Sequence, residues 1–226
     1  VERQGRPNPA PQRRDLRSLY SPRATRVLRV LLLYPKRIWK LQPLAQEAGV
    51  SLGQMFNVKK LLADREWIRS GEEGLRLVEP ASLLAEWSEN YSYRRNTVRD
   101  FYSLDPPGDV EVRLAAACRD AGIKYALTGF SAAARLAPAV RYQRVTAYVQ
   151  GEASDIARRL SLKEVTSGAN VTLLSPYDDG VFYGVADING VQIVSDVQAY
   201  LDLIGYRGRG EEAATFLLEQ VIQRRW

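Results

Sequence analysis

Two residue types that carry much of enzyme chemistry are almost missing from this chain. The sequence contains no histidine and a single cysteine, Cys118. Histidine is the commonest general base and metal ligand, so Ser-His-Asp and Cys-His hydrolysis and His-ligated zinc sites are excluded. Cys118 follows three alanines, which predicts a small buried side chain rather than a nucleophile. An enzyme built on this sequence would depend on carboxylates, Lys, Tyr or Ser.

A candidate nucleotide or phosphate cleft follows a short apolar segment. Thr128, Gly129 and Ser131 stand where a strand is expected to lead into a helix, as at the opening of nucleotidyltransferase folds. Free backbone N–H groups at such a helix start can bind phosphate. Nucleotidyltransferases also place two carboxylates, one residue apart, on the next strand to hold Mg²⁺. The next expected strand, 145–149, contains no carboxylate. We therefore expect a nucleotidyltransferase-like scaffold with no enzyme activity, metal or cofactor.

The other acidic and glycine-rich segments are weaker candidates. Asp178 and Asp179 precede Gly180 in a pattern typical of a turn, and Asp187 comes just before an Asn-Gly hairpin signal. Asp196 and Asp202 are six residues apart on an expected helix, so they point in different directions. The loop 205–210 lacks the Lys-Ser/Thr ending of a P-loop. It is interpreted as a flexible basic connection, with anion binding as the alternative.

The strongest recognition signal is a helix-turn-helix pattern between Leu41 and Leu62. A short helix over 43–48 is expected to stop at Gly49, which can adopt the left-handed conformation of a sharp turn. Ser51 then caps a second helix that runs to about Ala63. Helical spacing predicts that one stripe of this helix is buried: Leu52, Met55, Val58 and Leu62. Side chains suited to base edges and phosphates lie elsewhere on the helix: Ser51, Gly53, Gln54, Asn57, Lys59 and Lys60. Phe56 fits either the core or contacts with thymine methyl groups.

A β-hairpin over 67–77 completes the expected DNA-binding domain, with a glycine-containing loop at 70–74. Arg69 and Arg76 on its strands are candidate contacts to the DNA backbone. The acidic hairpin tip argues against insertion into the minor groove. With a preceding helix that begins after Ser21 and ends before Pro35, the pattern predicts a winged helix-turn-helix over 21–80. A winged helix that binds protein instead of DNA remains the alternative.

Charge and composition divide the chain. Residues 1–100 contain 19 Lys and Arg against 11 Asp and Glu, and the remaining residues contain 13 against 15. This asymmetry indicates that the first part meets a polyanion. The Pro- and Arg-rich segment 1–20 is expected to be a disordered basic arm. The segment 81–108 is expected to be a connecting helix and linker. Its run of aromatic and basic residues over 91–102 is interpreted as an interdomain clasp, with stacking on bases as the alternative.

The segment 109–226 is expected to be a mixed α/β domain, which makes the whole chain α+β. Helices are predicted at 110–121, 130–136, 153–160, 195–204 and 211–223, and strands at 125–128, 145–149, 171–174 and 181–194, the last as an Asn-Gly hairpin. No apolar run approaches the ~18 residues of a membrane span, and no secretory signal is found at the N-terminus. A cytoplasmic protein that does not bind membranes is therefore expected.

Several segments, in their order along the chain, resemble the AbiEi-type antitoxins, which are transcriptional regulators of type IV toxin–antitoxin systems. These segments are 50–54, 125–129, 144–146, 189–203 and 208–214, and the resemblance covers roughly residues 22–225. It implies an N-terminal winged helix that represses its own operon at an operator with inverted repeats. It also implies a C-terminal domain that counteracts a nucleotidyltransferase toxin, for which direct contact is not required. DNA contacts carry over only to residues 51–60. A ligand-sensing regulator with a nucleotide-binding domain and a divergent active nucleotidyltransferase remain alternatives.

Overall fold

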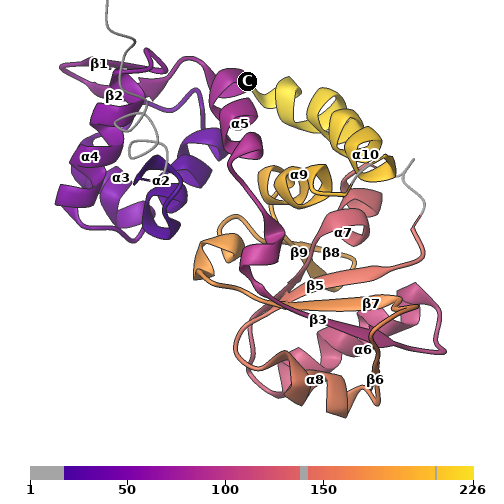
Figure 1. The fold of residues 1–226 in the computed structure, drawn as a ribbon. Helices are drawn as coiled ribbons and strands as arrows, with labels where there is room; N and C mark the ends of the chain where they lie inside the picture. Colours follow the sequence, from indigo (N-terminus) through magenta and orange to yellow (C-terminus); the bar gives the residue numbers. More distant parts are fainter. Residues whose placement is uncertain (1–17, 138–141, 207) are drawn as a thin grey trace, which may run out of the picture. The chain divides into compact units, whose positions relative to one another are not determined.

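The computed structural model describes residues 18–137, 142–206 and 208–226, and the chain divides into two compact units at Asn90–Tyr91. The first unit is mainly helical and includes a hairpin, whereas the second is built around a sheet (Figure 1). The chain is thus a mixed α+β protein, as the sequence predicts. None of the helices in the described ranges combines the length and apolarity needed to span a membrane.

The first unit contains three consecutive helices, a hairpin and a closing helix. These are α2 (Pro22–Leu33), α3 (Leu41–Glu47), α4 (Leu52–Ala63), β1 (Ile68–Gly71), β2 (Gly74–Leu77) and α5 (Pro80–Glu89). Strands β1 and β2 pair in antiparallel fashion, with Ile68 opposite Leu77. Trp39 pairs with Leu75 through two backbone hydrogen bonds of 2.8 Å, which extends the hairpin toward the helices.

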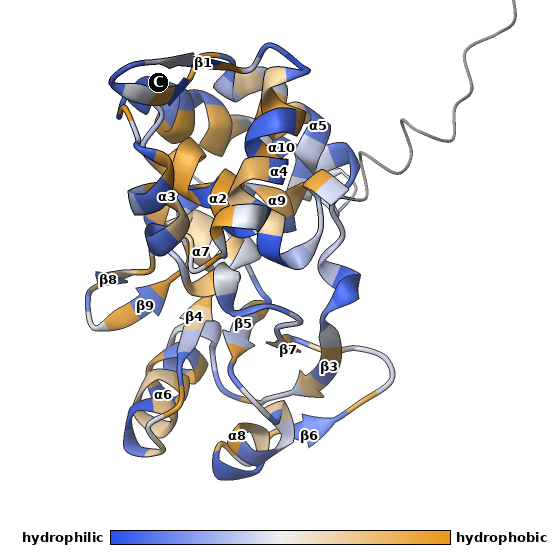
Figure 2. Cartoon of the chain, turned by 90° about the vertical axis from the view of Figure 1, so that its left-hand side faces the viewer, coloured by the Kyte–Doolittle hydropathy of each residue, from blue (hydrophilic) through white to orange (hydrophobic). Residues whose placement is uncertain are grey.

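The core of the first unit lies among the inward faces of these helices. Leu28, Leu44, Met55 and Leu62 have no exposed surface, and α2 is largely hydrophobic (Figure 2). Trp87 of α5 joins this core and lies under the buried guanidinium of Arg29, 5.0 Å from the ring centroid. Burial of aliphatic and aromatic side chains is the main favourable contribution to such a fold.

Residues 19 and 20, which the sequence places in a disordered arm, are packed in the structure. Leu19 and Tyr20 are buried, and the Tyr20 hydroxyl donates to Glu86 at 2.8 Å. Glu86 also forms an ion pair of 3.0 Å with Arg65. The prediction of a disordered arm through residue 20 is therefore wrong for these last residues, because an apolar pair at 19–20 can pack. Residues 1–17 of the expected arm lie outside the described residues.

The second unit consists of strands and helices in alternation. Its strands are β3 (Thr97–Tyr102), β4 (Tyr125–Leu127), β5 (Val145–Val149), β6 (Lys163–Glu164), β7 (Val171–Ser175), β8 (Ala186–Ile188) and β9 (Val191–Ile193). Its α-helices are α6 (Pro107–Asp120), α7 (Gly129–Leu136), α8 (Ala153–Arg159), α9 (Asp196–Ile204) and α10 (Arg209–Leu217). Short 3-10 turns lie at Tyr93–Arg95 and Asp179–Phe182, and α10 continues as a π-helical turn, Leu218–Ile222, and a 3-10 turn, Gln223–Arg225.

The strands form one mixed sheet in the order β6-β3-β7-β5-β4-β9-β8. Pairing is parallel between β5 and β7 and between β4 and β9, and antiparallel elsewhere. Helices α6 and α8 cover one face of the sheet, and α7, α9 and α10 lie over the other (Figures 1 and 2). The central strands β4 and β5 are buried throughout because both faces are covered.

The second unit begins before the boundary that the sequence indicates. Strand β3 pairs with β7 over five positions and with β6 over two, so residues 97–102 belong to the sheet rather than to a linker. Pro106 and Pro107 mark the start of α6 instead of a domain boundary, since Pro107 occupies its first turn. The hairpin predicted over 181–194 is shorter in the structure. Asp179–Phe182 forms a 3-10 turn, and the first strand of the hairpin starts at Ala186.

Candidate functional site

The turn before α4 has the geometry that the sequence predicts. Gly49 has a φ of +61°, in the left-handed region that favours glycine. The Ser51 hydroxyl accepts a hydrogen bond of 3.2 Å from the backbone N–H of Gln54, which caps the first turn of α4. The turn and the cap together fix where α4 begins and which of its faces points outward.

The buried stripe of α4 differs from the predicted one at two positions, because Leu61 is buried and Leu52 is not. Met55, Val58, Leu61 and Leu62 are buried, whereas 45% of Leu52 is exposed. The prediction for Leu52 is wrong because it is the first residue of the helix and lies beyond the edge of the packed core. Phe56, which the sequence leaves ambiguous, is 55% exposed and so lies outside the core.

The predicted base-contacting residues lie on the outward side of α4. Gly53, Asn57 and Lys60 are exposed and follow the i, i+4, i+7 spacing of a single helix face. Ser51 is also exposed, while Gln54 and Lys59 are half-buried at the borders of this face. We call Ser51, Gly53, Gln54, Asn57, Lys59 and Lys60 the α4 surface.

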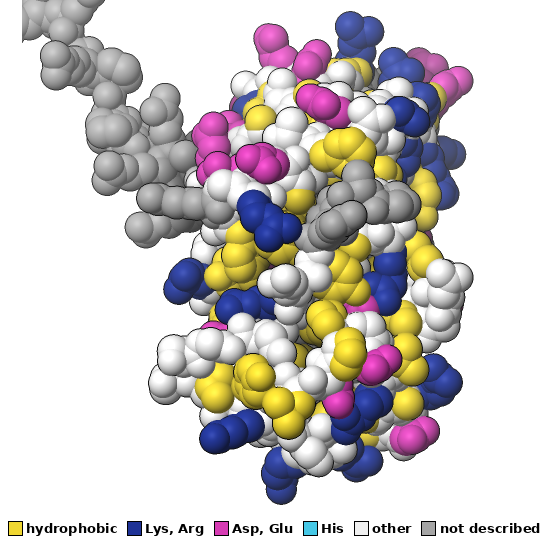
Figure 3. Space-filling view, turned by 90° about the vertical axis from the view of Figure 1, so that its right-hand side faces the viewer, with side chains coloured by type: hydrophobic (Ala, Val, Ile, Leu, Met, Phe, Trp, Pro, Cys, Tyr) yellow, Lys and Arg dark blue, Asp and Glu magenta, His cyan; other side chains and the backbone are white. Residues whose placement is uncertain are grey.

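The hairpin adds two cations to this unit. Arg69 and Arg76 are directly paired across β1 and β2 and both are exposed. Like charges directly opposite each other destabilise a strand pair unless an anion lies between or near them. Glu72 and Glu73 at the tip are exposed, so the tip itself is acidic. Over the face drawn in Figure 3, Lys and Arg side chains are scattered among hydrophobic and acidic ones.

The candidate cleft residues of the second unit point into its core. Thr128 and Ser131 have no exposed surface, and Gly129, with a φ of +54°, begins α7. The Thr128 hydroxyl donates to Asp202 at 2.5 Å, and the Ser131 hydroxyl accepts from the backbone N–H of Thr146 at 3.3 Å. Their side chains therefore hold α7 against α9 and β5.

Asp202 is the centre of a buried polar network that the sequence does not indicate. One carboxylate oxygen accepts from Tyr91 at 2.5 Å, Tyr148 at 2.9 Å and Gln198 at 3.1 Å, and the other accepts from Thr128. Burial raises the pKa of Asp202, and the hydrogen bonds oppose that rise. The network ties α9 to β5 and to the segment before β3.

The aromatic and basic run over 91–102 is used inside the second unit. Tyr91 belongs to the Asp202 network, and burial raises its pKa. The Tyr93 ring stacks on Tyr206 with centroids 4.9 Å apart. Phe101 is 2% exposed, and Arg99 forms an ion pair of 3.0 Å with Glu164. Tyr91, Tyr93 and Phe101 thus make their contacts within the second unit. These contacts argue against the alternative that the three rings stack on nucleic-acid bases.

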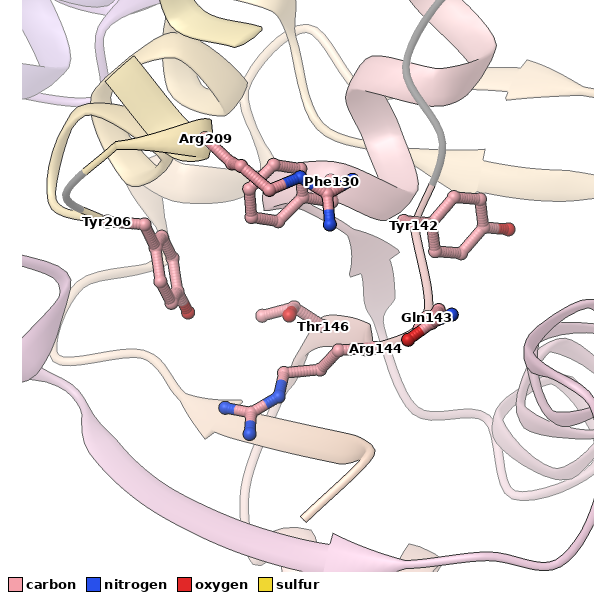
Figure 4. Close-up of a pocket in the computed structure, with 7 residues that line it drawn as sticks. All are labelled: Phe130, Tyr142, Gln143, Arg144, Thr146, Tyr206 and Arg209. Carbon is pink, nitrogen blue, oxygen red and sulfur yellow. The ribbon is translucent and has the colours of Figure 1, made fainter. Parts of the chain in front are cut away.

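A pocket of about 200 Å³ lies beside the start of α7 (Figure 4). Phe130, adjacent to the buried cleft residues, forms part of its wall. Arg144 and Thr146 come from the start of β5, and Tyr206 and Arg209 come from the connection between α9 and α10. Tyr142 and Gln143 complete the lining. In Figure 4 the side chains of Tyr206, Thr146 and Arg144 surround an open space, and Arg209 lies next to Phe130.

Sequence reasoning missed this pocket, although two signals pointed near it. The loop 205–210, for which the sequence leaves anion binding as the alternative, supplies Tyr206 and Arg209. The predicted cleft residues Thr128 and Ser131 are buried, and it is their neighbour Phe130 that lines the pocket. The sequence does not show which side chains of α7 face the core. It also does not show that a segment more than sixty residues further along the chain packs beside α7.

No cluster of three or more His, Cys, Asp and Glu side chains within the described ranges is placed to hold a metal ion. Cys118 is buried, and burial raises its pKa to about 12, so its thiol stays protonated at neutral pH. These groups therefore offer neither a preformed metal site nor a reactive thiolate.

Comparison with known proteins gives one match. A family model described as "Transcriptional regulator, AbiEi antitoxin, Type IV TA system" matches residues 76–223. No curated protein and no solved structure matches the chain. The matched segment includes all the described strands and helices of the second unit up to Ile222, whereas the whole α4 surface and most of the hairpin precede it.

Proposed function

Because this chain belongs to the AbiEi antitoxin family of type IV toxin–antitoxin transcriptional regulators, we propose that it represses its own operon by binding operator DNA through its first unit. We further propose that its second unit counteracts a nucleotidyltransferase toxin without being an enzyme itself. The observation that carries the DNA-binding proposal is the outward-facing, capped α4 surface.

Three features of the first unit support DNA binding. Helices α2, α3 and α4 and the hairpin follow each other in the order typical of a winged helix-turn-helix. Asn57 offers an amide for an adenine edge, and Lys60 offers a cation for a phosphate. The facing pair Arg69 and Arg76 is suited to the DNA backbone, because a polyanion would relieve their mutual repulsion.

The exposed Phe56 extends this argument. Phe56, between Gly53 and Lys60, is a large apolar side chain that exposes 55% of its surface. The methyl group of thymine in the major groove is a natural apolar partner for it. An operator with A·T pairs under the middle of α4 is therefore expected.

The proposal that the second unit is not an enzyme is supported by strand β5. Thr146 and Tyr148, one residue apart, lie on the same side of the strand, at the spacing that a pair of metal-binding carboxylates would need. The Asp202 carboxylate accepts from the Tyr148 hydroxyl, and four hydrogen bonds in all hold it in the core. Neither arrangement provides the two-metal clamp of phosphoryl transfer.

The test of DNA binding is a titration of the full chain against the DNA upstream of its own gene. The Asn57→Ala variant should bind about tenfold more weakly, since a bidentate base contact contributes about 1–3 kcal/mol. The Lys60→Glu variant should lose affinity for all DNA sequences. The slope of the logarithm of its affinity against the logarithm of salt concentration should fall in magnitude by about one. The matched control is Lys163→Glu, the same charge reversal on the exposed strand β6 of the second unit.

Equal affinity of Asn57→Ala, Lys60→Glu and the unaltered chain for the operator would contradict the assignment of α4 as the recognition helix. A loss of binding in Lys163→Glu as large as in Lys60→Glu would show that net charge, and not the α4 surface, drives the interaction.

The antitoxin role is tested separately, by growth of cells that express the toxin encoded beside this gene. The Lys60→Glu variant should lose repression of a reporter joined to its own promoter but still restore growth, because the second unit is unaltered. Failure of the unaltered chain to restore growth would refute the antitoxin role. Incorporation of labelled nucleotide into tRNA by this chain with Mg²⁺ would refute the proposal that it is not an enzyme.

A further inference from the structure

None of the residues that line the pocket beside α7 belongs to the α4 surface or bonds to Asp202 in the buried network. We propose that it binds a nucleoside monophosphate, with the phosphate between Arg144 and Arg209 and the base against Phe130 and Tyr206. This inference goes beyond the proposed function and does not depend on it, because every lining residue belongs to the second unit.

The charge of the pocket selects an anion. Its seven lining residues include two arginines and no acidic residue. Arg144 donates one hydrogen bond of 2.8 Å to the carbonyl of Ala169, which orients its guanidinium and leaves other N–H groups for a ligand. Arginine is the residue best suited to phosphate, because its planar fork can donate two parallel hydrogen bonds. The pocket therefore presents two guanidinium groups that are suited to phosphate.

The aromatic residues in the wall of the pocket favour a ligand with a flat aromatic ring. The rings of Phe130 and Tyr206 have centroids 5.9 Å apart and are tilted by 55° to each other. Together they form an angled aromatic wall on one side of the space drawn in Figure 4. Stacking of a base on such rings is favourable and tolerates any base identity. The Thr146 hydroxyl supplies a polar group that can bond to a sugar or base edge.

The aromatic wall is held in place before any ligand arrives. Tyr206 stacks on Tyr93 at an interplanar angle of 10°. A Cβ atom at Gly205 would lie 3.1 Å from the Tyr93 ring, so a glycine there allows Tyr93 to approach closely. Burial raises the pKa of Tyr206, which keeps its phenol neutral. A rigid wall reduces the entropic cost of binding.

The size of the pocket points to a mononucleotide. Sites for drug-sized ligands usually enclose about 300–1,000 Å³, and this pocket encloses about 200 Å³. That volume can enclose a base or a ribose phosphate while the remainder of the ligand stays in solvent. A dinucleotide would leave most of its surface uncovered.

The test is isothermal titration of the full chain, without DNA or Mg²⁺, with AMP, GMP, CMP and UMP. Inorganic phosphate and adenosine are titrated in parallel, because each carries only one half of the proposed recognition. We expect at least one monophosphate to bind more tightly than either half. Arg144→Ala and Arg209→Ala should each weaken binding about tenfold, the usual effect of losing a charge-assisted hydrogen bond. Phe130→Leu, which keeps the charges, should weaken it about fivefold.

Arg159→Ala is the matched control, since Arg159 is an exposed arginine on α8, on the other face of the sheet. Thermal melting of each variant establishes that the unit remains folded. Absence of saturable binding of all four monophosphates at millimolar concentration would overturn the proposal. So would binding of inorganic phosphate as tight as that of the nucleotides, or binding that Arg144→Ala and Arg209→Ala leave unchanged.

Discussion

Replacement of Asp202 by alanine should lower the stability of the second unit more than replacement of any exposed acidic residue. The carboxylate is fully buried and accepts hydrogen bonds from Thr128, Tyr91, Tyr148 and Gln198. An orphaned buried donor costs about 1–3 kcal/mol. Tyr91 and Tyr148 are 3.2 Å apart and can bond to each other, so two to three donors lose their acceptor. The free energy of unfolding should fall by about 3–5 kcal/mol.

The isosteric Asp202→Asn variant should cost less, about 1–2 kcal/mol, because its carbonyl oxygen still accepts. The control is Asp155→Asn on α8, whose carboxylate pairs with Arg158 in solvent and should contribute less than about 0.5 kcal/mol. Urea unfolding followed by circular dichroism measures the loss. Hydrogen exchange over β4, β5 and α9 assigns it to this unit. A loss below about 1 kcal/mol for Asp202→Ala would refute the account of the network.

The same residue gives the chain a pH dependence of known sign. Because burial raises the pKa of Asp202, at a pH between the unfolded and folded values the folded state holds a proton that the unfolded state has already released. The contribution of Asp202 to stability is therefore fully present below its unfolded pKa of about 3.9 and is lost as pH rises through the folded value. The difference in stability between the unaltered chain and Asp202→Asn should shrink as pH rises through that window.

Two glycines provide further predictions. Gly210→Ala should destabilise the junction of α9 and α10 by more than 1 kcal/mol, since a Cβ there would lie 2.5 Å from both the Leu203 carbonyl oxygen and the Tyr206 Cβ; thermal melting measures the loss, and an unchanged melting temperature would contradict it. Gly49→Ala should cost about 1 kcal/mol through its left-handed backbone alone, because the added Cβ would make only an ordinary contact of 3.5 Å. Gly53→Ala is the control for both, as its Cβ would meet nothing within 4 Å; a loss as large as that of Gly49→Ala would show that backbone conformation is not the cause.

Local patterns were sufficient for the elements with strong signals. Strand β5 lies at the predicted residues because five apolar or β-favouring residues in a row suit a strand buried on both faces. The hairpin of β8 and β9 turns at Asn189 and Gly190, both with positive φ, as an Asn-Gly turn requires. The turn at Gly49 and the Ser51 cap were likewise predictable, since each depends on one residue and its neighbours.

Strand β3 was missed because its sequence does not resemble a strand of a buried sheet. It contains Arg99 and Asp100, and Phe101 is its one buried residue. The charges are satisfied by distant partners: Glu164 pairs with Arg99, and the Thr172 hydroxyl donates to Asp100 at 2.6 Å. Only the fold brings these partners to β3, so hydropathy alone could not reveal that the segment completes the sheet.

The candidate cleft illustrates a different limit. The sequence motif predicted a cleft at the start of α7, but it could not say which of its residues face inward. Rotation of about 100° per residue turns Phe130 outward while Thr128 and Ser131 face the core. The remaining walls come from segments that are distant in sequence. A pocket assembled in this way depends on tertiary packing, which no local pattern encodes.

Strand β5 links the absence of catalytic carboxylates to the proposed ligand. Arg144, just before the strand, shares the alternation of Thr146 and Tyr148, so a cation and two hydroxyls occupy the side on which magnesium-binding carboxylates would be needed. A cation repels a metal ion but attracts phosphate directly, whereas carboxylates require the metal as a bridge. A phosphate at this site would therefore be held by protein cations alone. Its affinity should then be the same with Mg²⁺ and with a chelator, and a strict requirement for Mg²⁺ would argue for a different arrangement of the site.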